Sequence, residues 1–444
     1  MLQALQMCLQ QNNAEFTAED RMFLHTFAPA VVNFTLWVIR EAAKSGKKRL
    51  YFLARDGYYM YHAARMLGIE GIEYRYLKLS RYSIRSAQYH ILGDKSIDYI
   101  CTGGIDVTFE KIMKRAMMSD EEALNIAELA GYKQRYTEVL NYNEVMALKP
   151  VLLKIPVFWE ILSTRSEQIY PKTVSYLRQE GLFDDVDYAL VDSGWIGTLQ
   201  RSLQQLVQKP VEGYYFGLFE IPDDMSKDRY HAYYFEPCKG FDIKNIKRKA
   251  HFANSLFEAV CSAPEGMTLG YKEENNRYMP QYSINTNPNA VNICRNMWLI
   301  QCLIEQYIKI TDTISIEKLI TKQNTDDITD KILSLLMGKP VYEEARYFGS
   351  YIFCDDILEH QLQPVAARLT KEDIQNQRIV NKALIIKGIK KAKIHESAWL
   401  EGSVVLGEKA GKYTDSQNID IAGELRHVRA YKYIIHIRKA LKKK

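Results

Sequence analysis

The sequence predicts an α/β protein with a Rossmann-like, mainly parallel sheet, a helical insertion and a helical C-terminal region. Two stretches lead to this prediction, residues 49–67 and 188–207. Each runs from a short apolar segment through a turn with small residues into the apolar spacing of a helix. A third apolar segment, residues 74–79, follows the first of these helices. Strands that alternate with helices favour a parallel sheet, because a parallel crossover needs a connection of helix length.

The chain before the first predicted strand is expected to be helical. Residues 17–20, Thr-Ala-Glu-Asp, resemble a capping box with Asp in place of Glu and predict a helix start. Residues 30–44 are strongly apolar and end at Ser45 and Gly46, which predicts a mostly buried helix that packs on the sheet and ends there.

The later elements are predicted in the same way. Residues 95–180 are expected to form a mostly helical insertion, with a capping box at 119–122. Strands are expected at 213–219 and 231–235, followed by a basic cluster in a loop at Lys244, Lys247, Arg248 and Lys249. Further helices are predicted at 288–309, 326–337, 340–348 and about 423–442. The chain thus divides into an α/β core, residues 1–270, and a mainly helical region, residues 271–444, with a basic terminal helix.

Composition and charge narrow the class of protein. The net charge is +5, but no acid follows Glu424, while eight basic residues do, so the body of the chain is close to neutral and no nucleic-acid partner is expected. Seven cysteines without a C-x-x-C pair favour a reduced, cytoplasmic protein. We find no signal peptide and no apolar run long enough for a transmembrane helix. Residues 426–444 form either a solvated terminal helix or a peripheral contact with anionic lipid at the inner membrane face.

Two aspartates mark a candidate site. Asp56 and Asp192 each follow an apolar strand and precede a helix, and ligands of open α/β sheets bind beyond the carboxyl ends of the strands. If the two strands are neighbours, both carboxylates face one crevice. Arg55 and Arg81 are expected to bind anionic oxygens there. The alternative is that each aspartate simply caps the helix that follows it.

The remaining candidate residues would bind substrate or phosphate around this pair. They are Gly57, Ser80, Ser193, Gly194, Trp195, Gly197, Thr198 and Glu258. The small residues from Gly194 to Thr198 are expected to cradle a phosphate at a helix N-terminus. Glu258 has an apolar setting and is either a site carboxylate or a surface residue of an amphipathic helix. A cofactor is not defined by the sequence, although Asp56 and Asp192 are candidate ligands for Mg²⁺.

An ordered set of motifs resembles a known family. The motifs are Phe34-x-x-Trp37-Val-Ile, Leu50-Tyr-Phe-Leu-Ala-Arg-Asp-Gly57-Tyr, Ser80-Arg81, Val191-Asp-Ser-Gly-Trp-Ile-Gly-Thr198-x-Gln200, and Phe257-Glu258 before Ala263-Pro264-Glu-Gly266. They resemble proteins of bacterial surface-polysaccharide gene clusters that are usually described as hydrolases of the haloacid dehalogenase (HAD) superfamily. The resemblance covers about residues 25–270, with weaker likeness at 399–402. It implies a HAD-like fold, which is expected here without the catalytic dehalogenase-type domain. Gly194 stands where a dehalogenase-type phosphatase needs a second acid after Asp192.

The chain is also similar, more loosely, to type I phosphoribosyltransferases. In that comparison Asp192 would bind ribose hydroxyls, residues 194–198 would cradle the 5′-phosphate and residues 55–57 would meet the diphosphate, with one acid of the motif missing. Together these observations predict an enzyme that acts on a phosphorylated or nucleotide-linked sugar, by glycosyl or phosphoryl transfer, in bacterial surface-polysaccharide biosynthesis. The alternatives are a HAD-like phosphohydrolase and a non-catalytic binding partner of glycan-assembly enzymes.

Overall fold

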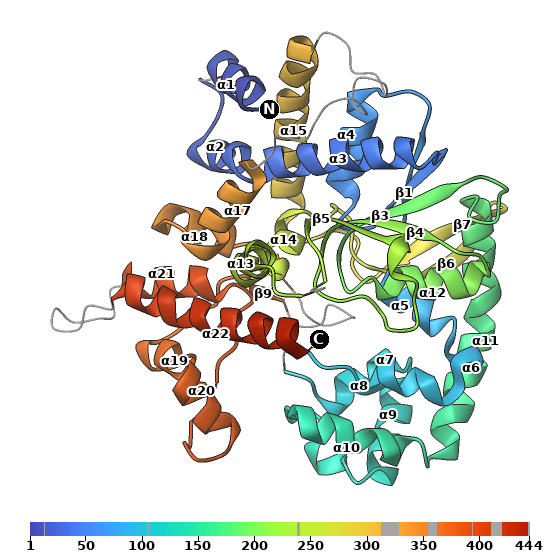
Figure 1. Ribbon diagram of the computed structural model, residues 1–444. Coiled ribbons are helices and arrows are strands. Elements are labelled where there is room, and N and C mark those ends of the chain that lie inside the picture. The colour runs from blue at the N-terminus through green and yellow to red at the C-terminus, as the bar shows by residue number, and fades with distance from the viewer. Residues whose placement is uncertain are drawn as a thin grey trace.

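A five-stranded parallel sheet lies at the centre of the computed structural model (Figure 1). The structure describes residues 1–442 apart from 13, 105, 238–239, 312–327, 354–361, 393 and 410–419. The strands are β1 (Arg49–Leu53), β2 (Glu73–Leu77), β3 (Tyr188–Trp195), β4 (Glu212–Leu218) and β5 (Tyr230–Phe235). The α/β class and the parallel sheet that the sequence predicts are therefore confirmed.

The order of the strands, β2-β1-β3-β4-β5, reverses direction next to β1. Leu50 of β1 pairs with Tyr74 of β2 on one side and with Ala189 of β3 on the other. The chain therefore leaves β1 towards one edge of the sheet and leaves β3 towards the opposite edge. Such a switch point opens a crevice between the two strand ends, where doubly wound sheets bind their ligands.

Alternating side chains of the strands bury both faces of the sheet. Leu50, Phe52 and Val191 belong to the apolar core on one face. The helices of that core are α3 (Phe27–Lys44), α4 (Tyr58–Leu67), α14 (Asn254–Val260) and α15 (Ala290–Thr311). Tyr51 and Leu190 point to the opposite core. The helices there are α5 (Arg81–Ser86), α11 (Pro156–Gln179) and α12 (Thr198–Val207). The result is a sheet between two helical layers.

The N-terminal helices are α1 (Leu2–Gln11) and α2 (Ala18–His25). The predicted capping box starts α2, because Thr17 N donates to Asp20 Oδ2 over 2.8 Å and Asp20 N donates to Thr17 Oγ1 over 3.1 Å. Residues 18–44 are long and apolar enough to cross a membrane by length and composition, but 83% of the apolar window is buried inside the protein. A core helix of this kind is what the sequence predicts for residues 30–44.

The insertion between β2 and β3 is helical, as predicted. Its further helices are α6 (Tyr89–Leu92), α7 (Ile97–Ile100), α8 (Phe109–Arg115), α9 (Asp120–Leu129) and α10 (Tyr142–Leu152). Phe109, Ile112 and Phe158 are fully buried in a core that the insertion forms from its own residues. The capping box at Ser119 and Glu122 begins α9. The insertion therefore has its own apolar centre below the sheet (Figure 1).

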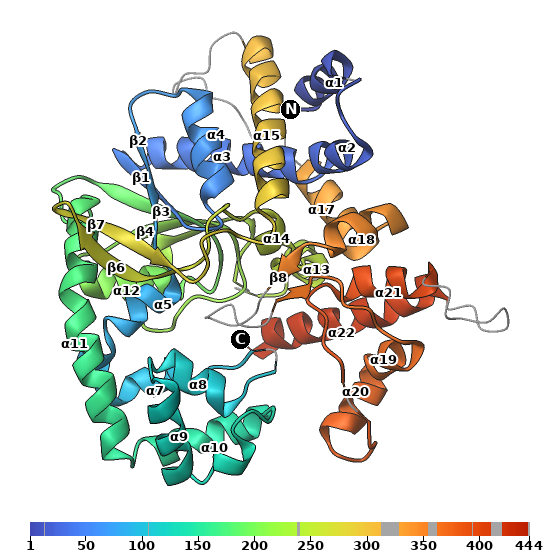
Figure 2. The same cartoon turned by 180° about the vertical axis from the view of Figure 1, so that it is seen from behind.

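A hairpin that the sequence analysis missed lies beside α11 (Figure 2). It consists of β6 (Thr268–Glu274) and β7 (Arg277–Tyr282), joined by Asn275 and Asn276, whose φ angles of 51° and 59° suit a two-residue hairpin turn. The ring of Tyr271 stacks on that of Tyr176 in α11 with 4.1 Å between centroids. The predicted boundary at residue 270 thus falls inside a β-hairpin.

The C-terminal region shares the main apolar core. Its elements are α17 (Ile328–Gly338), α18 (Tyr342–Gly349), β8 (Ile352–Phe353), β9 (Gln363–Pro364), α19 (Lys371–Asn376), α20 (Ile379–Ile386), α21 (Leu400–Lys409) and α22 (Ile421–Lys442). Trp399 is fully buried and donates from Nε1 to Met337 O over 2.9 Å. The apolar core of the C-terminal region is therefore continuous with the core that α3 and α15 form.

The prediction of a loop at residues 244–249 is wrong, because these residues belong to the helix α13 (Ile243–His251). Asp242 caps this helix by accepting from the backbone N–H groups of Lys244 and Asn245 over 2.9 and 3.2 Å. Ile246 and Ala250 are fully buried on its inner face, so burial holds a helix together despite the basic residues between them.

Candidate functional site

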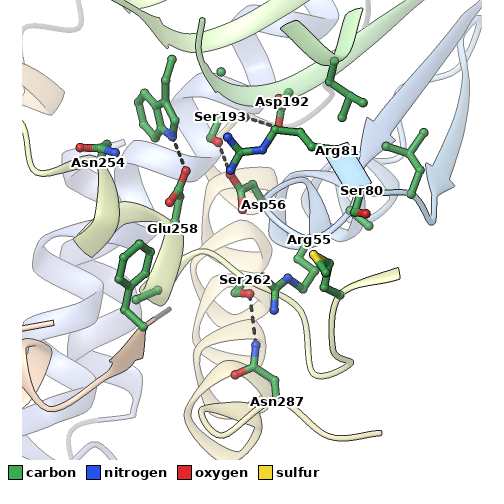
Figure 3. A pocket seen from close by; sticks show the side chains of 18 of the residues that line it. Arg55, Asp56, Ser80, Arg81, Asp192, Ser193, Asn254, Glu258, Ser262 and Asn287 are labelled. Carbon is green, nitrogen blue, oxygen red and sulfur yellow. Dashed lines mark hydrogen bonds between the residues drawn. The ribbon is translucent and has the colours of Figure 1, made fainter. Parts of the chain in front are cut away.

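A cavity of about 350 Å³ opens beyond the carboxyl ends of β1 and β3, at the switch point of the sheet (Figure 3). Its wall is built from residues 54–56 after β1, residues 79–81 at the start of α5 and residues 192–199 from the end of β3 to the start of α12, with further residues from α14 and from the segment 287–289. Every candidate site residue that the sequence identified lines this cavity, with the exception of Gly57. The volume falls in the range of small-molecule sites.

Asp56 and Asp192 lie next to each other in this cavity and share one neighbour, Ser193 (Figure 3). The Ser193 hydroxyl donates to Asp56 Oδ2, and the Ser193 backbone N–H donates to Asp192 Oδ1 over 2.9 Å. Neither aspartate is a helix cap: α4 and α12 begin after Gly57 and Gly197, and neither start has a side-chain cap. The capping alternative therefore does not describe either residue.

The two carboxyl groups differ in their preference for a proton. Burial raises the pKa of Asp192 well above its ordinary value, and the negative charge of Asp56 raises it further. Burial also raises the pKa of Asp56, but the hydrogen bond from Ser193 and the charges of Arg55 and Arg81 work against this shift. Asp192 is therefore the carboxyl group of the pair that binds a proton more readily.

A third carboxylate, Glu258 of α14, faces the same cavity. Trp195 donates to it from Nε1, so the acid is anchored at the cavity wall rather than on an outer helix surface. Trp195 itself has a φ of 76°, a left-handed conformation that is rare for a bulky residue. Its ring packs against Phe235 and Phe252, with centroids 6.2 and 5.1 Å away. The aromatic cluster thus fixes Trp195 in the orientation that holds Glu258.

Arginine side chains supply the positive charge of the cavity. Arg81, the first residue of α5, is exposed and forms no ion pair with any residue that the structure describes. Its charge acts on both Asp56 and Asp192. Arg55 lines the cavity on the other side of Asp56 (Figure 3). Arg55 and Arg81 thus place two positive charges at the cavity wall, where they would attract an anionic group of a substrate.

Arg85 is a buried cation behind the cavity wall that the sequence analysis missed. Its Nη2 donates to Thr198 Oγ1 over 2.6 Å, and its guanidinium lies 4.3 Å from the ring centroid of Tyr99. Within the described part of the chain it pairs with no carboxylate. Burial and the charge of Arg81 lower the pKa of Arg85 to about 10, so it stays charged at neutral pH. The spacing Arg81-x-x-x-Arg85 is the sequence signal, because residues four apart share a helix face.

The start of α12 completes the anion-binding side. Gly197 precedes it with a φ of 69°, and no side chain caps the first turn. Thr198 and Leu199 line the cavity, so the positive end of the helix dipole lies at its edge. With Arg81 in front and Arg85 behind, this corner suits a phosphate.

The predicted phosphate-binding loop, Gly194 to Thr198, is shorter in the structure than the sequence predicts. β3 does not end at Val191 but continues to Trp195, because Gly194 pairs with Gly217 and Trp195 with Leu218 of β4. Asp192, Ser193 and Gly194 therefore lie on a strand. Gly57 lies beneath the wall: its N–H donates to Leu53 O over 2.8 Å and is not free for a ligand. Gly197, Thr198 and Leu199 therefore form the part of the cavity wall that suits a phosphate.

No family model matches this chain, and its sequence matches no curated protein. The chemistry of the site is therefore inferred from the residues that line the cavity.

The metal prediction concerns Asp56 and Asp192. Among the residues that the structure describes, no group of three or more His, Cys, Asp or Glu side chains is placed to hold a metal ion. A pair of carboxylates suits Mg²⁺ when substrate phosphate oxygens and water supply its other ligands. Mg²⁺ at this pair therefore stays a prediction, and one that depends on a phosphorylated substrate.

Replacing Arg85 tests whether the cavity binds a phosphate at the start of α12. In Arg85→Met the cavity keeps its lining but loses the charge behind Thr198, so we expect phosphate affinity to fall about tenfold, or about 1.4 kcal/mol. We expect no loss in the free energy of unfolding, because a buried cation without an acid partner costs stability. Calorimetric titration and thermal unfolding measure the two effects, with Arg65→Met on α4, outside the cavity, as the control. Unchanged affinity in Arg85→Met would contradict a role for this cation.

Proposed function

We propose that the protein is an enzyme that binds a phosphorylated or nucleotide-linked sugar in this cavity and transfers its glycosyl or phosphoryl group to an acceptor. One observation supports this above all: a pair of buried carboxyl groups with raised pKa values, Asp56 and Asp192, lies in the same cavity as Arg81 and the uncapped start of α12. A role in bacterial surface-polysaccharide assembly, and a HAD-like or phosphoribosyltransferase-like type of fold, are proposed from the sequence motifs.

The cavity has two chemically different halves, and a sugar phosphate also has two. Arg81 and the α12 start suit the phosphate, since guanidinium and backbone N–H groups donate to its oxygens. Asp56, Asp192 and Glu258 suit the sugar hydroxyls, because carboxylates accept their hydrogen bonds. A ligand that spans the cavity from Thr198 to Glu258 would meet both halves.

The different pKa shifts of the two carboxyl groups support acid–base catalysis. The acceptor hydroxyl oxygen attacks the sugar carbon or the phosphorus while Asp56 removes the hydroxyl proton. In glycosyl transfer the carbon–oxygen bond breaks with its electron pair on the phosphate oxygen, and in phosphoryl transfer the phosphorus–oxygen bond breaks with its electron pair on the oxygen that leaves phosphorus. Asp192 donates its proton to that leaving oxygen. Ser193 keeps Asp56 oriented through its hydroxyl. The proton gained by Asp56 then returns to Asp192, and the pair is ready for a further turnover.

The two alternatives predict different behaviour. A dehalogenase-type phosphohydrolase needs an acid two residues after its nucleophilic aspartate, but Tyr58 and Gly194 stand there. A non-catalytic binding partner would bind the ligand without consuming it.

The experiment offers sugar 1-phosphates and nucleotide sugars with an acceptor sugar and follows the phosphorus by ³¹P NMR. We expect Asp56→Asn to lower turnover at least about 100-fold while ligand binding persists. The matched control is Asp185→Asn, an exposed acid before β3. Turnover that needs only water would identify a phosphohydrolase, and binding without turnover in the wild type would identify a binding partner. Equal turnover in Asp56→Asn and wild type would remove the assignment.

A further inference from the structure

A second cavity, of about 410 Å³, lies between α13, α17 and α22. None of the residues that line the first cavity lines this one. Four basic side chains line it: Lys247, Lys339, Arg426 and Arg429. Among the residues that the structure describes, no acidic side chain lines it. The three helices that enclose it come from distant parts of the sequence, so the fold gathers these charges in one place.

The charges in this cavity are poorly neutralised. Within the described part of the chain, Lys247, Lys339 and Arg429 form no ion pair. Arg429 donates from Nε to the backbone oxygen of Leu425 over 2.9 Å. Arg426 meets Asp420 at 3.7 Å, and both side chains are 73% exposed, so water screens that pair. Like charges gathered in this way repel each other unless an anion lies among them.

Two basic residues close to the cavity in sequence, but outside its lining, form ion pairs. Arg248 of α13 lies 3.0 Å from Asp330, and Lys432 of α22 lies 2.6 Å from Glu401. Neither of them lines the cavity. On the same two helices, therefore, Arg248 and Lys432 have carboxylate partners, whereas the basic residues that line the cavity lack a close one within the described part of the chain.

His251 is a buried polar side chain in the cavity wall. It is 7% exposed, its Nε2 lies 3.2 Å from the Tyr433 hydroxyl, and its Nδ1 has no hydrogen-bond partner in the described structure. Burial and the charges of Arg429 and Lys247, with those of Lys432 and Lys339, lower the pKa of His251 to about 4. The ring is thus neutral at pH 7.

We propose that this cavity binds a phosphate group. Arginine, lysine and tyrosine side chains are the donors that bind phosphate oxygens, and the cavity presents all three kinds. The group belongs either to a soluble phosphate compound or to an anionic lipid headgroup. The exposed Leu335 in the lining and Val341 nearby, 61% and 57% exposed, would suit the lipid. This site does not depend on the function proposed for the Asp56 cavity.

The test follows His251 directly. In protein labelled with ¹³C in its histidine rings, the His251 signal, assigned by its loss in His251→Gln, should shift and saturate as inorganic phosphate is added. We expect Arg429→Gln to weaken this binding at least about tenfold, because it removes a charge that lines the cavity. Arg438→Gln, an exposed position of the same helix outside the cavity, should bind as the wild type does.

The two sources of phosphate are separated by sedimentation with vesicles. Binding to phosphatidylglycerol–phosphatidylcholine vesicles, with none to pure phosphatidylcholine, and its loss in Arg429→Gln would identify the lipid headgroup. A saturating His251 shift without vesicle binding would identify a soluble phosphate compound. The proposal is overturned if phosphate leaves the His251 signal unmoved, or if Arg438→Gln weakens phosphate binding as much as Arg429→Gln does.

Discussion

Asp192→Asn is expected to lower turnover at least about 100-fold and, at the same time, to make the protein harder to unfold at neutral pH. The loss of turnover follows because the amide cannot give a proton to the leaving group, and general acids contribute about 10²–10⁴-fold. The gain in stability follows because burial and Asp56 disfavour a charge at this position. The asparagine side chain is neutral at every pH and avoids that cost.

The gain in stability should depend on pH in a defined direction. The pKa of Asp192 is raised in the folded protein, so between its unfolded and folded pKa values the folded state binds a proton that the unfolded state has released. The wild type therefore loses stability as pH rises through this interval. Below the unfolded pKa, about 3.9, the residue is protonated in both states and the effect vanishes. Asp192→Asn should thus gain about 0.5–2 kcal/mol at pH 8 and nothing near pH 3.

Denaturant unfolding at several pH values measures this effect, with Asp185→Asn as the matched control. Asp185 is exposed before β3, so its replacement should leave both stability and turnover near the wild-type values. A loss of stability in Asp192→Asn at pH 8, in a protein that still folds, would show that the charge of Asp192 is favourable. Full turnover in this variant would remove Asp192 from the chemistry.

Gly194→Ala should unfold more easily by about 3–5 kcal/mol, a large part of the stability of a typical protein. A Cβ at this position would lie 2.6 Å from Gly217 O and 2.9 Å from Tyr215 Cδ1. The residue also has a φ of 109°, a conformation that alanine rarely adopts. Both the clash with a neighbouring strand and the backbone strain add to the cost.

The control for this variant is Gly270→Ala on β6. A Cβ there would meet no atom within 4 Å, so its stability should stay close to that of the wild type. Thermal and denaturant unfolding measure the difference between the two. If Gly194→Ala were as stable as Gly270→Ala, the close pairing of β3 with β4 at this position would be wrong.

Much of the candidate site could be predicted because it depends on short-range patterns. Asp56, Arg81 and Asp192 each follow an apolar segment, and parallel strands bring such positions to one edge of a sheet. The sequence could not give the length of β3, since Ser193 and Gly194 have the composition of a turn. Pairing with Gly217 of β4 extends the strand through them, and this tertiary contact overrides local preference.

Other features were missed for different reasons. The β6–β7 hairpin had a signal, two asparagines between alternating segments, that would have identified it. Asn287 and Ile352 also line the first cavity, but they come from later parts of the chain and carry no motif. Tertiary packing brings them there: the β8 segment contacts α14, and α15 contacts α3 and α4.

The helical insertion also has a consequence for the order of folding. β1 can pair with β3 only after the chain between them has closed a long loop, and such a closure costs entropy while the loop is disordered. The insertion has its own apolar core, and its last helix returns to its starting point, where the Tyr176 hydroxyl accepts from Lys78 N over 3.0 Å. Local contacts form faster than distant ones, so the insertion is expected to fold early and shorten that closure. Asp56 and Asp192 would then meet only once the segment between them had taken shape.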